Sequence, residues 1–218
     1  MRGNFSQKLL LIAAIFLLAA GVGVRAQKKT AIASGNYGSL VLGVDPEGVL
    51  TGYFMEGTGD DGNGNPRFTC AFFIRGEKRK DGGFDVETWY PEDPADVIKG
   101  ELKPADAGGK TGVNLHLDGE HGGCWNVAPM LKEDGGVDFE MTSAGSWESI
   151  RVVSPARVYL FKSSGAKAPQ KIYLVKGDVV RILQTKGDRA EISYTNDKGR
   201  TTNGWMETGD FFPLFPNQ

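Results

Sequence analysis

Side chains that carry chemistry are scarce in this chain of 218 residues, which has only two cysteines and two histidines. No serine nucleophile elbow, phosphate-binding glycine loop or dinucleotide-binding fingerprint occurs. Asp and Glu are plentiful, but no two of them stand out as the carboxylate pair that glycoside hydrolysis needs. These absences predict a non-catalytic protein that uses no cofactor.

Long apolar runs are also missing, except at the N-terminus. Arg2 and Lys8 accompany an apolar run of 16 residues over 9–24, and Val24 and Ala26 are small residues that suit a signal peptidase. A membrane-spanning helix needs about 20 residues, so a permanent anchor is the less favoured alternative. Residues 1–26 are predicted to be a secretory signal peptide. The mature chain is then exported, periplasmic or secreted, without a membrane anchor.

The two cysteines of an exported chain are expected to form a disulfide, Cys70–Cys124. It would close a loop of roughly 55 residues and stabilise the fold by about 4 kcal/mol in the chain-entropy model. Two free thiols are the alternative, which suits export poorly. The stretch GGCWN around Cys124 is similar to the Cys-Trp pair of papain-like peptidases, which need a histidine after the cysteine. Both histidines precede Cys124, which excludes that activity.

Hydrophobic and polar residues alternate along most of the chain after residue 26. In GFDVETWYP, Phe84, Val86 and Thr88 share one face of a strand, and Asp85 and Glu87 share the other. Similar segments end at Gly, Pro, Asp or Asn, and none has helical spacing. The sequence predicts an all-β protein in which residues 27–150 form an antiparallel meander, closed into a barrel or sandwich.

The segment GVDPEGVLTGYF predicts a hairpin with Pro46 and Gly48 in its turn. It resembles the opening hairpin of the calycin-type barrels, the avidin-like and lipocalin-like folds. This resemblance implies a barrel, and it implies no biotin or lipid site.

Charge is unevenly divided along the chain. Residues 27–151 hold 12 Lys and Arg against 21 Asp and Glu, a net charge of −9, and residues 152–218 hold 10 against 6, a net +4. This division argues against a nucleic-acid ligand, and indicates either two surfaces with different partners or two solvated halves. Pro155 also interrupts a strand-like run close to the point where the charge changes sign. A domain junction is therefore predicted between Trp147 and Val153, with residues 151–218 as the second domain.

Residues 152–213 resemble the bacterial SH3-like (SH3b) domain. The resemblance is carried by a Lys-Gly-Asp turn at 176–178, the strand VVRILQ, a Gly-Asp turn at 187–188, the strand EISYT, and Gly204-Trp205. It implies a small barrel that binds cell-wall material or an envelope protein. Members often carry NVRSGPS in the first loop, which is absent here, and Trp at the position of Arg189. Both positions commonly shape a ligand groove, so a strong wall-peptide site is not implied.

Six aromatic residues are the candidate ligand-binding groups, with core positions as the alternative. Three of them, together with Phe161, are predicted to form a shelf for a glycan or extended peptide in the C-terminal domain: Tyr159, Tyr194 and Trp205. Three more could stack on a sugar in the N-terminal domain: Trp89, Tyr90 and Trp125.

Two segments imitate metal sites. His116, Glu120 and His121 offer ligands that suit zinc, but two histidines five residues apart in a strand-turn segment favour a solvated turn. In GDDGNGNPRF, oxygen donors alternate at positions 61, 63 and 65, as in a calcium-binding loop. The places that need Gly and Glu hold Pro and Phe, which favours a hairpin loop. No metal site is predicted.

The combined prediction is an exported, non-catalytic binding protein of the cell envelope, whose SH3-like module engages peptidoglycan or an envelope partner. The alternative is an inhibitor or immunity-type protein whose acidic N-terminal domain covers a basic cell-wall hydrolase.

Overall fold

The chain is all-β, as predicted. The computed structural model describes residues 31–214, so the predicted signal peptide lies outside the described residues. The N-terminal strands are β1 (Gly35–Tyr37), β2 (Leu40–Val44), β3 (Leu50–Thr58), β4 (Phe68–Lys78), β5 (Phe84–Tyr90), β6 (Asp93–Asp106), β7 (Thr111–Leu117), β8 (Val137–Glu140) and β9 (Ser143–Ala144). The C-terminal strands are β10 (Ser149–Val152), β11 (Arg157–Tyr159), β12 (Tyr173–Val175), β13 (Val179–Lys186), β14 (Arg189–Thr195) and β15 (Thr201–Glu207). The 3-10 helices are η1 (Cys124–Asn126), η2 (Pro129–Lys132) and η3 (Thr208–Asp210).

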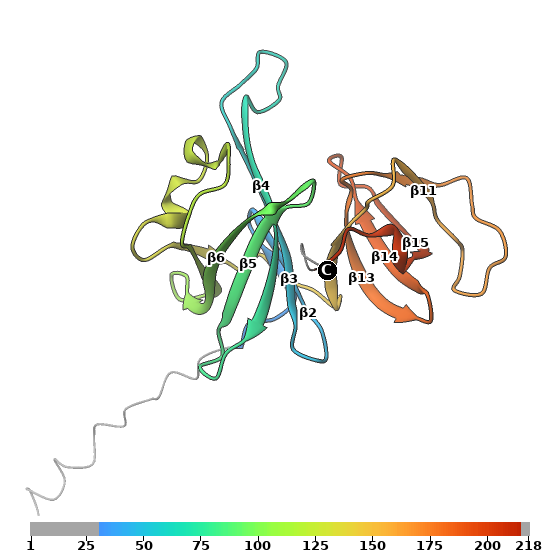
Figure 1. Cartoon of the computed structure of the whole chain (residues 1–218), viewed down its shortest axis with the longest axis horizontal. Coiled ribbons are helices and arrows are strands. Elements are labelled where there is room, and N and C mark those ends of the chain that lie inside the picture. The colour runs from blue at the N-terminus through green and yellow to red at the C-terminus, as the bar shows by residue number, and fades with distance from the viewer. Residues whose placement is uncertain (1–30, 215–218) are drawn as a thin grey trace, which may run out of the picture.

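The first nine strands form one antiparallel sheet in which neighbours in sequence are neighbours in space, from β1 to β8. The sheet curls strongly (Figure 1). Its two edges are bordered by the same stretch of chain, because β8 pairs with β7 and β9, only two residues later, pairs with β1. Met141 N donates to Thr111 O, and Thr142 N donates to Asn36 O. Residues 137–144 therefore close the curled sheet into what we call the N-terminal barrel.

The hairpin between β2 and β3 forms where the sequence predicts it. Gly48 adopts a φ of +85°, which a residue with a side chain rarely does, and its N–H donates to Asp45 O at 3.0 Å. The Asp45 carboxylate also accepts a bond from Val49 N at 2.7 Å. Asp45 and Gly48 thus fix the reversal of the chain.

Alternation along the strands fills the barrel interior with apolar side chains. Phe54 and Phe72 stack with ring centroids 4.9 Å apart, and both are fully buried. Other fully buried members of this core come from β2, β3, β4, β6 and β7: Leu40, Leu42, Leu50, Ile74, Leu102 and Leu115. The interior is a packed core.

One end of the barrel is covered by the segment that carries η1 and η2. The predicted disulfide is present, and it joins Cys70 on β4 to Cys124 on η1 across a sequence separation of 54. Leu131 on η2 is 3 % exposed and joins the barrel core. We call residues 118–136 the end segment, because they cover this opening and are held there by the disulfide.

The chain passes from the first sheet to a second one between Ala144 and Ser149. The second sheet has the order β10-β13-β14-β15, and β11 pairs with β12 beside it. Ten buried residues form a core of their own, among them Leu160, Val180 and Ile192. We call residues 149–214 the C-terminal module. No helix in the described residues is long and apolar enough to cross a membrane.

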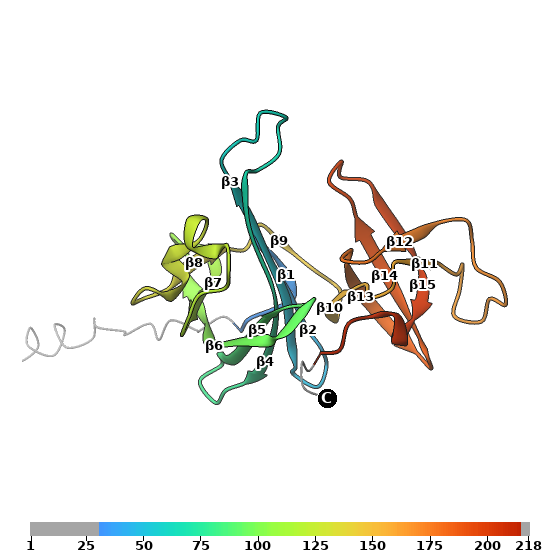
Figure 2. The same cartoon turned by 45° about the horizontal axis from the view of Figure 1, so that its top comes forward.

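The barrel and the C-terminal module are joined by a third apolar cluster, which we call the seam. Its buried members are Phe73 and Trp89 from the barrel and Ile150 and Val152 from the module. Trp147, which is partly buried against this cluster, donates from its indole N–H to Leu42 O at 2.7 Å. In both views the two parts lie side by side at this point (Figures 1 and 2).

Polar contacts fix the orientation of the two parts at the seam. Ile150 N donates to Thr51 Oγ1 at 2.8 Å, and Arg181 donates to Asn36 Oδ1 at 3.0 Å. The Arg181 guanidinium also lies over the Trp147 ring at 4.9 Å. These bonds join β10 and β13 to the barrel, so the module packs against the barrel on one defined side.

Candidate functional site

Exposed aromatic residues gather on the outward face of β11 and the residues that follow it. Val158 and Leu160 are buried in the module core, whereas Arg157 and Tyr159 are exposed and Phe161 is half-buried. Because side chains alternate along a strand, Arg157, Tyr159 and Phe161 share the outer face.

Tyr173 on β12 lies directly opposite Tyr159 on β11. The two rings meet edge to face with centroids 5.8 Å apart, and both residues keep more than two fifths of their surface exposed. The Arg157 guanidinium lies over the Tyr173 ring at 4.3 Å. A hydrogen bond from Arg157 to Tyr159, with the nearby Tyr173 and Tyr159 hydroxyls, raises the pKa of Arg157 above its usual range. This corner therefore presents two open rings and a permanent positive charge.

Trp205 on β15 lies opposite Phe161 through an isolated antiparallel bridge, with N···O distances of 2.7 and 2.9 Å. Side chains of directly opposed residues share a face, so Phe161 and Trp205 both point outward. Leu160 packs on Gly204, where a side chain would collide with it at 2.9 Å. We call the set formed by Tyr159, Phe161, Tyr173 and Trp205 the aromatic strip.

Arg189, at the position where the predicted SH3-like resemblance would lead us to expect Trp, contacts the first loop of the module. Its guanidinium lies over the Phe161 ring at 3.6 Å and donates to the backbone oxygens of Ser164 and Ala166 at 3.0 and 2.8 Å. It thereby holds the first loop of the module, residues 162–172, beside the strip. Lys162, Lys167 and Lys171 are exposed on that loop.

The chemistry of the strip is stacking next to positive charge. Tyrosine and tryptophan rings present large apolar faces with few rotatable bonds, which suits stacking on a sugar ring or an extended peptide. The arginine and lysine side chains alongside favour a ligand that carries negative charge.

Tyr194 does not belong to the strip, although the sequence suggested that it would. It is half-buried and packs against the module core. Burial, reinforced by a hydrogen bond to Asp178, raises the pKa of Tyr194 to about 12. Tyr194 therefore lies at the rim of the core.

The three candidates in the N-terminal barrel lie in different environments. Trp89 is 2 % exposed and meets Phe73 edge to face in the seam, so we leave it out of the candidate site. Tyr90, next in sequence, is 46 % exposed. Trp125 is 64 % exposed on the end segment, beside the disulfide.

Sequence reasoning missed Arg157 and Tyr173. The segment KIYLV offered a signal, since Tyr173 and Val175 flank the buried Leu174 in strict alternation. The pairing of β11 with β12 could not be inferred from that pattern, because it joins residues on the two sides of the first loop.

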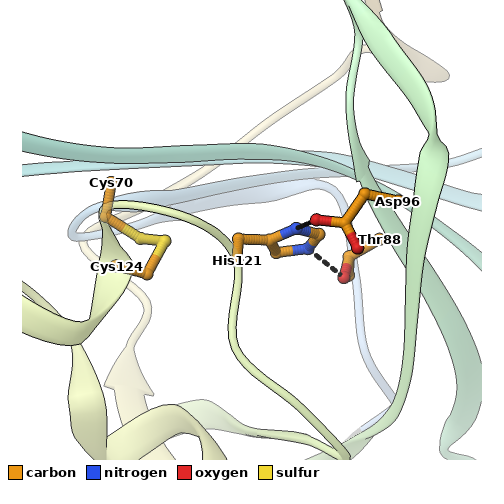
Figure 3. Close-up of a disulfide and its surroundings, with 5 residues drawn as sticks. All are labelled: Cys70, Thr88, Asp96, His121 and Cys124. Carbon is orange, nitrogen blue, oxygen red and sulfur yellow. Dashed lines mark hydrogen bonds and ion pairs between the residues drawn. A yellow bond between two sulfur atoms is a disulfide. The ribbon is translucent and has the colours of Figure 1, made fainter.

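His121 is buried on the end segment, in contrast to the solvated turn that the sequence favoured, and its ring faces Thr88 on β5 and Asp96 on β6 (Figure 3). Thr88 Oγ1 donates to Ile98 O at 3.0 Å and is hydrogen-bonded to His121 Nε2 at 2.8 Å. His121 Nδ1 lies 3.7 Å from Asp96 Oδ2. Burial lowers the pKa of His121, and the Asp96 carboxylate offsets this only in part. His121 thus anchors the end segment to the barrel wall.

We expect wild-type stability to fall more steeply than that of His121→Gln as the pH falls from about 7.5 to about 5.5. An unfolded histidine has a pKa near 6.5, and the folded value for His121 is lower, so the unfolded chain binds more protons below pH 6.5. His121 therefore contributes its full share of stability above the pKa of the unfolded state. This share is lost as the pH falls toward the pKa of the folded state, at no more than about 1.4 kcal/mol per pH unit. Urea denaturation of both proteins at the two pH values measures this. Equal losses in the two proteins would contradict it.

The loop that imitates a calcium site is held by its own hydrogen bonds. The Asp61 carboxylate accepts bonds from the backbone N–H groups of Asn63 and Asn65 and from the Asn65 amide. These bonds, that from the Asn65 amide first, lower the pKa of Asp61 to about 2. Across residues 31–214 no group of three or more His, Cys, Asp or Glu side chains could hold a metal ion.

A charged groove of about 360 Å³ runs over the outer face of β4, β5 and β6. Arg75, Glu87 and Lys99 lie opposite one another across these strands, so their charges alternate. Opposite charges on directly opposed residues stabilise a sheet, which gives this row a structural role.

No family model, curated protein or solved structure matches the chain. The SH3-like and calycin-type resemblances therefore stay predictions.

Proposed function

We propose that the chain is an exported, non-catalytic binding protein of the cell envelope, and that its C-terminal module binds cell-wall glycan or peptide through the aromatic strip. The observation that carries this proposal is the pair of opposed, exposed rings of Tyr159 and Tyr173 beside Arg157. Open aromatic rings next to arginine are typical of binding surfaces, where such residues contribute most of the affinity.

The position of the seam supports this use of the strip. The module packs against the barrel through β10 and β13, and the strip is built from β11, β12 and β15. The ligand surface therefore stays open while the module is held. The Cys70–Cys124 disulfide supports an exported protein, since such bonds persist in oxidising compartments.

We expect the full-length chain to sediment with purified peptidoglycan sacculi, and the double variant Tyr159→Ala/Tyr173→Ala to bind at least about tenfold more weakly. Removing two ring contacts at somewhat over 0.7 kcal/mol each amounts to a tenfold change in affinity. Bound and free protein are quantified over a range of sacculus concentrations. Met55→Ala, which removes an exposed side chain from the barrel that is no candidate ligand contact, serves as the control and should bind like wild type.

Two outcomes would contradict this proposal. One is a wild-type chain that stays in the supernatant at all sacculus concentrations. The other is a double variant that sediments as well as the Met55→Ala control while its circular dichroism and melting temperature match those of wild type.

A further inference from the structure

Large apolar side chains are exposed around the disulfide at one end of the N-terminal barrel. Trp125 is 64 % exposed, Met130 is 54 % exposed and Phe68 is 41 % exposed. Trp125 and Met130 belong to the end segment, and Phe68 begins β4. We call these three residues, with Glu56, the disulfide-end surface.

The β3–β4 hairpin brings Phe68 to this surface. The hairpin extends beyond the barrel as a long arm (Figures 1 and 2). Phe68 and Cys70 are two residues apart on β4 and so share one face, and Glu56 lies opposite Cys70 on β3. Since Cys70 is bonded to Cys124 and Trp125 follows it, this face of the arm is the one next to the end segment.

The disulfide-end surface is held rigid in the unbound chain. The disulfide joins its two halves, and Gly123 packs against Thr69 O closely enough that a Cβ there would lie 3.2 Å away. At the tip of the arm, the bonds accepted by Asp61 fix the turn. A preformed surface loses less conformational entropy when it binds.

The two segments that build the surface are acidic, although the Arg67 guanidinium lies over the Phe68 ring at 5.4 Å. Residues 55–69 hold three acidic residues and one basic residue, and residues 118–134 hold four and one, so the two segments carry seven negative and two positive charges, or −5. At the tip, Asp61 keeps its charge down to a pH of about 2. Exposed apolar side chains in segments of net negative charge are complementary to a partner with basic residues around an apolar cleft.

We infer that the disulfide-end surface docks a basic protein, a cell-wall hydrolase, and the choice of that class of partner rests on the envelope location proposed above. Trp125 and Phe68 supply the apolar contacts, and the acidic residues of the arm and the end segment steer the encounter. This surface lies in the barrel and shares no residue with the aromatic strip, so hydrolase binding and sacculus binding can fail separately.

The test uses the full-length chain, produced in an oxidising compartment so that the disulfide forms, and two basic wall hydrolases, a lysozyme and an amidase. Titration calorimetry should show binding to at least one of them, with inhibition of its wall-cleaving activity. Phe68→Ala/Trp125→Ala should weaken that binding at least about tenfold, because buried tryptophan and its neighbours dominate interfaces. Met55→Ala is the matched control, since Met55 is 57 % exposed on the same arm but lies on its other face.

A second pair of measurements tests the charge. Glu56→Gln/Asp60→Asn keeps the size of both side chains and should slow association, and wild-type binding should weaken as NaCl rises from 50 to 300 mM. Absence of binding to both hydrolases would overturn the inference. So would equal losses for Met55→Ala and Phe68→Ala/Trp125→Ala, or apolar self-association of the chain in place of hydrolase binding. Sacculus sedimentation of the same variants should stay at the wild-type level, which separates this result from the role of the strip.

Discussion

Replacing Cys70 and Cys124 with alanine is expected to lower the free energy of unfolding by about 4 kcal/mol. The disulfide closes a loop with a sequence separation of 54, and the chain-entropy model assigns a stabilisation of this size to a loop of that length. The bond also holds the end segment over the barrel opening. Its loss should therefore expose the core around Leu131 as well as enlarge the unfolded ensemble.

Guanidinium denaturation of wild type and the double alanine variant measures this effect. Wild type treated with a reducing agent should behave like the variant, because both lack the cross-link. Hydrogen exchange should increase first in residues 118–136. A variant as stable as oxidised wild type would show that the end segment is held by packing alone.

Trp89→Ala is expected to destabilise the chain by about 3–5 kcal/mol, the usual cost of removing a large buried aromatic side chain. Trp89 is 2 % exposed, contacts Phe73 and joins a cluster to which the C-terminal module contributes Ile150 and Val152. The cavity left behind lies between the two parts of the molecule. We therefore expect the variant to unfold in two steps, with the module separating first.

Thermal denaturation followed by calorimetry and by tryptophan fluorescence tests this expectation. Tyr90→Ala is the neighbouring control, and it should cost within about 0.5 kcal/mol because Tyr90 is exposed. If Trp89→Ala left stability unchanged and abolished ligand binding instead, Trp89 would be a ligand contact, as the sequence first suggested.

Local patterns in the sequence were enough to predict the all-β class, the turn at Asp45–Gly48 and the Cys70–Cys124 bond. Each depends on residue types that are close in sequence or, for the cysteines, on there being only one possible pair. The structure of the end segment around Trp125 could not be predicted in the same way, because short 3-10 turns leave no periodic pattern in the sequence.

The seam was harder to foresee, though β4 contains a clue. Phe72, Phe73 and Ile74 are consecutive and all buried, so alternation breaks down in this strand. Phe72 and Ile74 face the barrel interior, and Phe73 faces the C-terminal module. A strand that is apolar on both faces indicates that both faces are covered, but its sequence does not say by which part of the chain.

The sequence predicts only some of the residues that form the aromatic strip. Residue type alone indicates Tyr159, Phe161 and Trp205, and it indicates Tyr194 equally although Tyr194 packs against the core. What separates Tyr194 from Tyr173 is strand pairing across the first loop, a non-local feature that residue type does not report.

The way the barrel closes bears on when it can form. Asn36 bonds Ser143, which lies 107 positions later, and β10 begins at Ser149 and packs at once against the barrel wall. Synthesis delivers the N-terminus first, so one edge of β1 has no partner strand until about two thirds of the chain has been made. Contacts of such long range make folding slow. A holding chaperone that shields β1 during this delay would be needed more by this molecule than by one whose first strands pair only with their sequence neighbours.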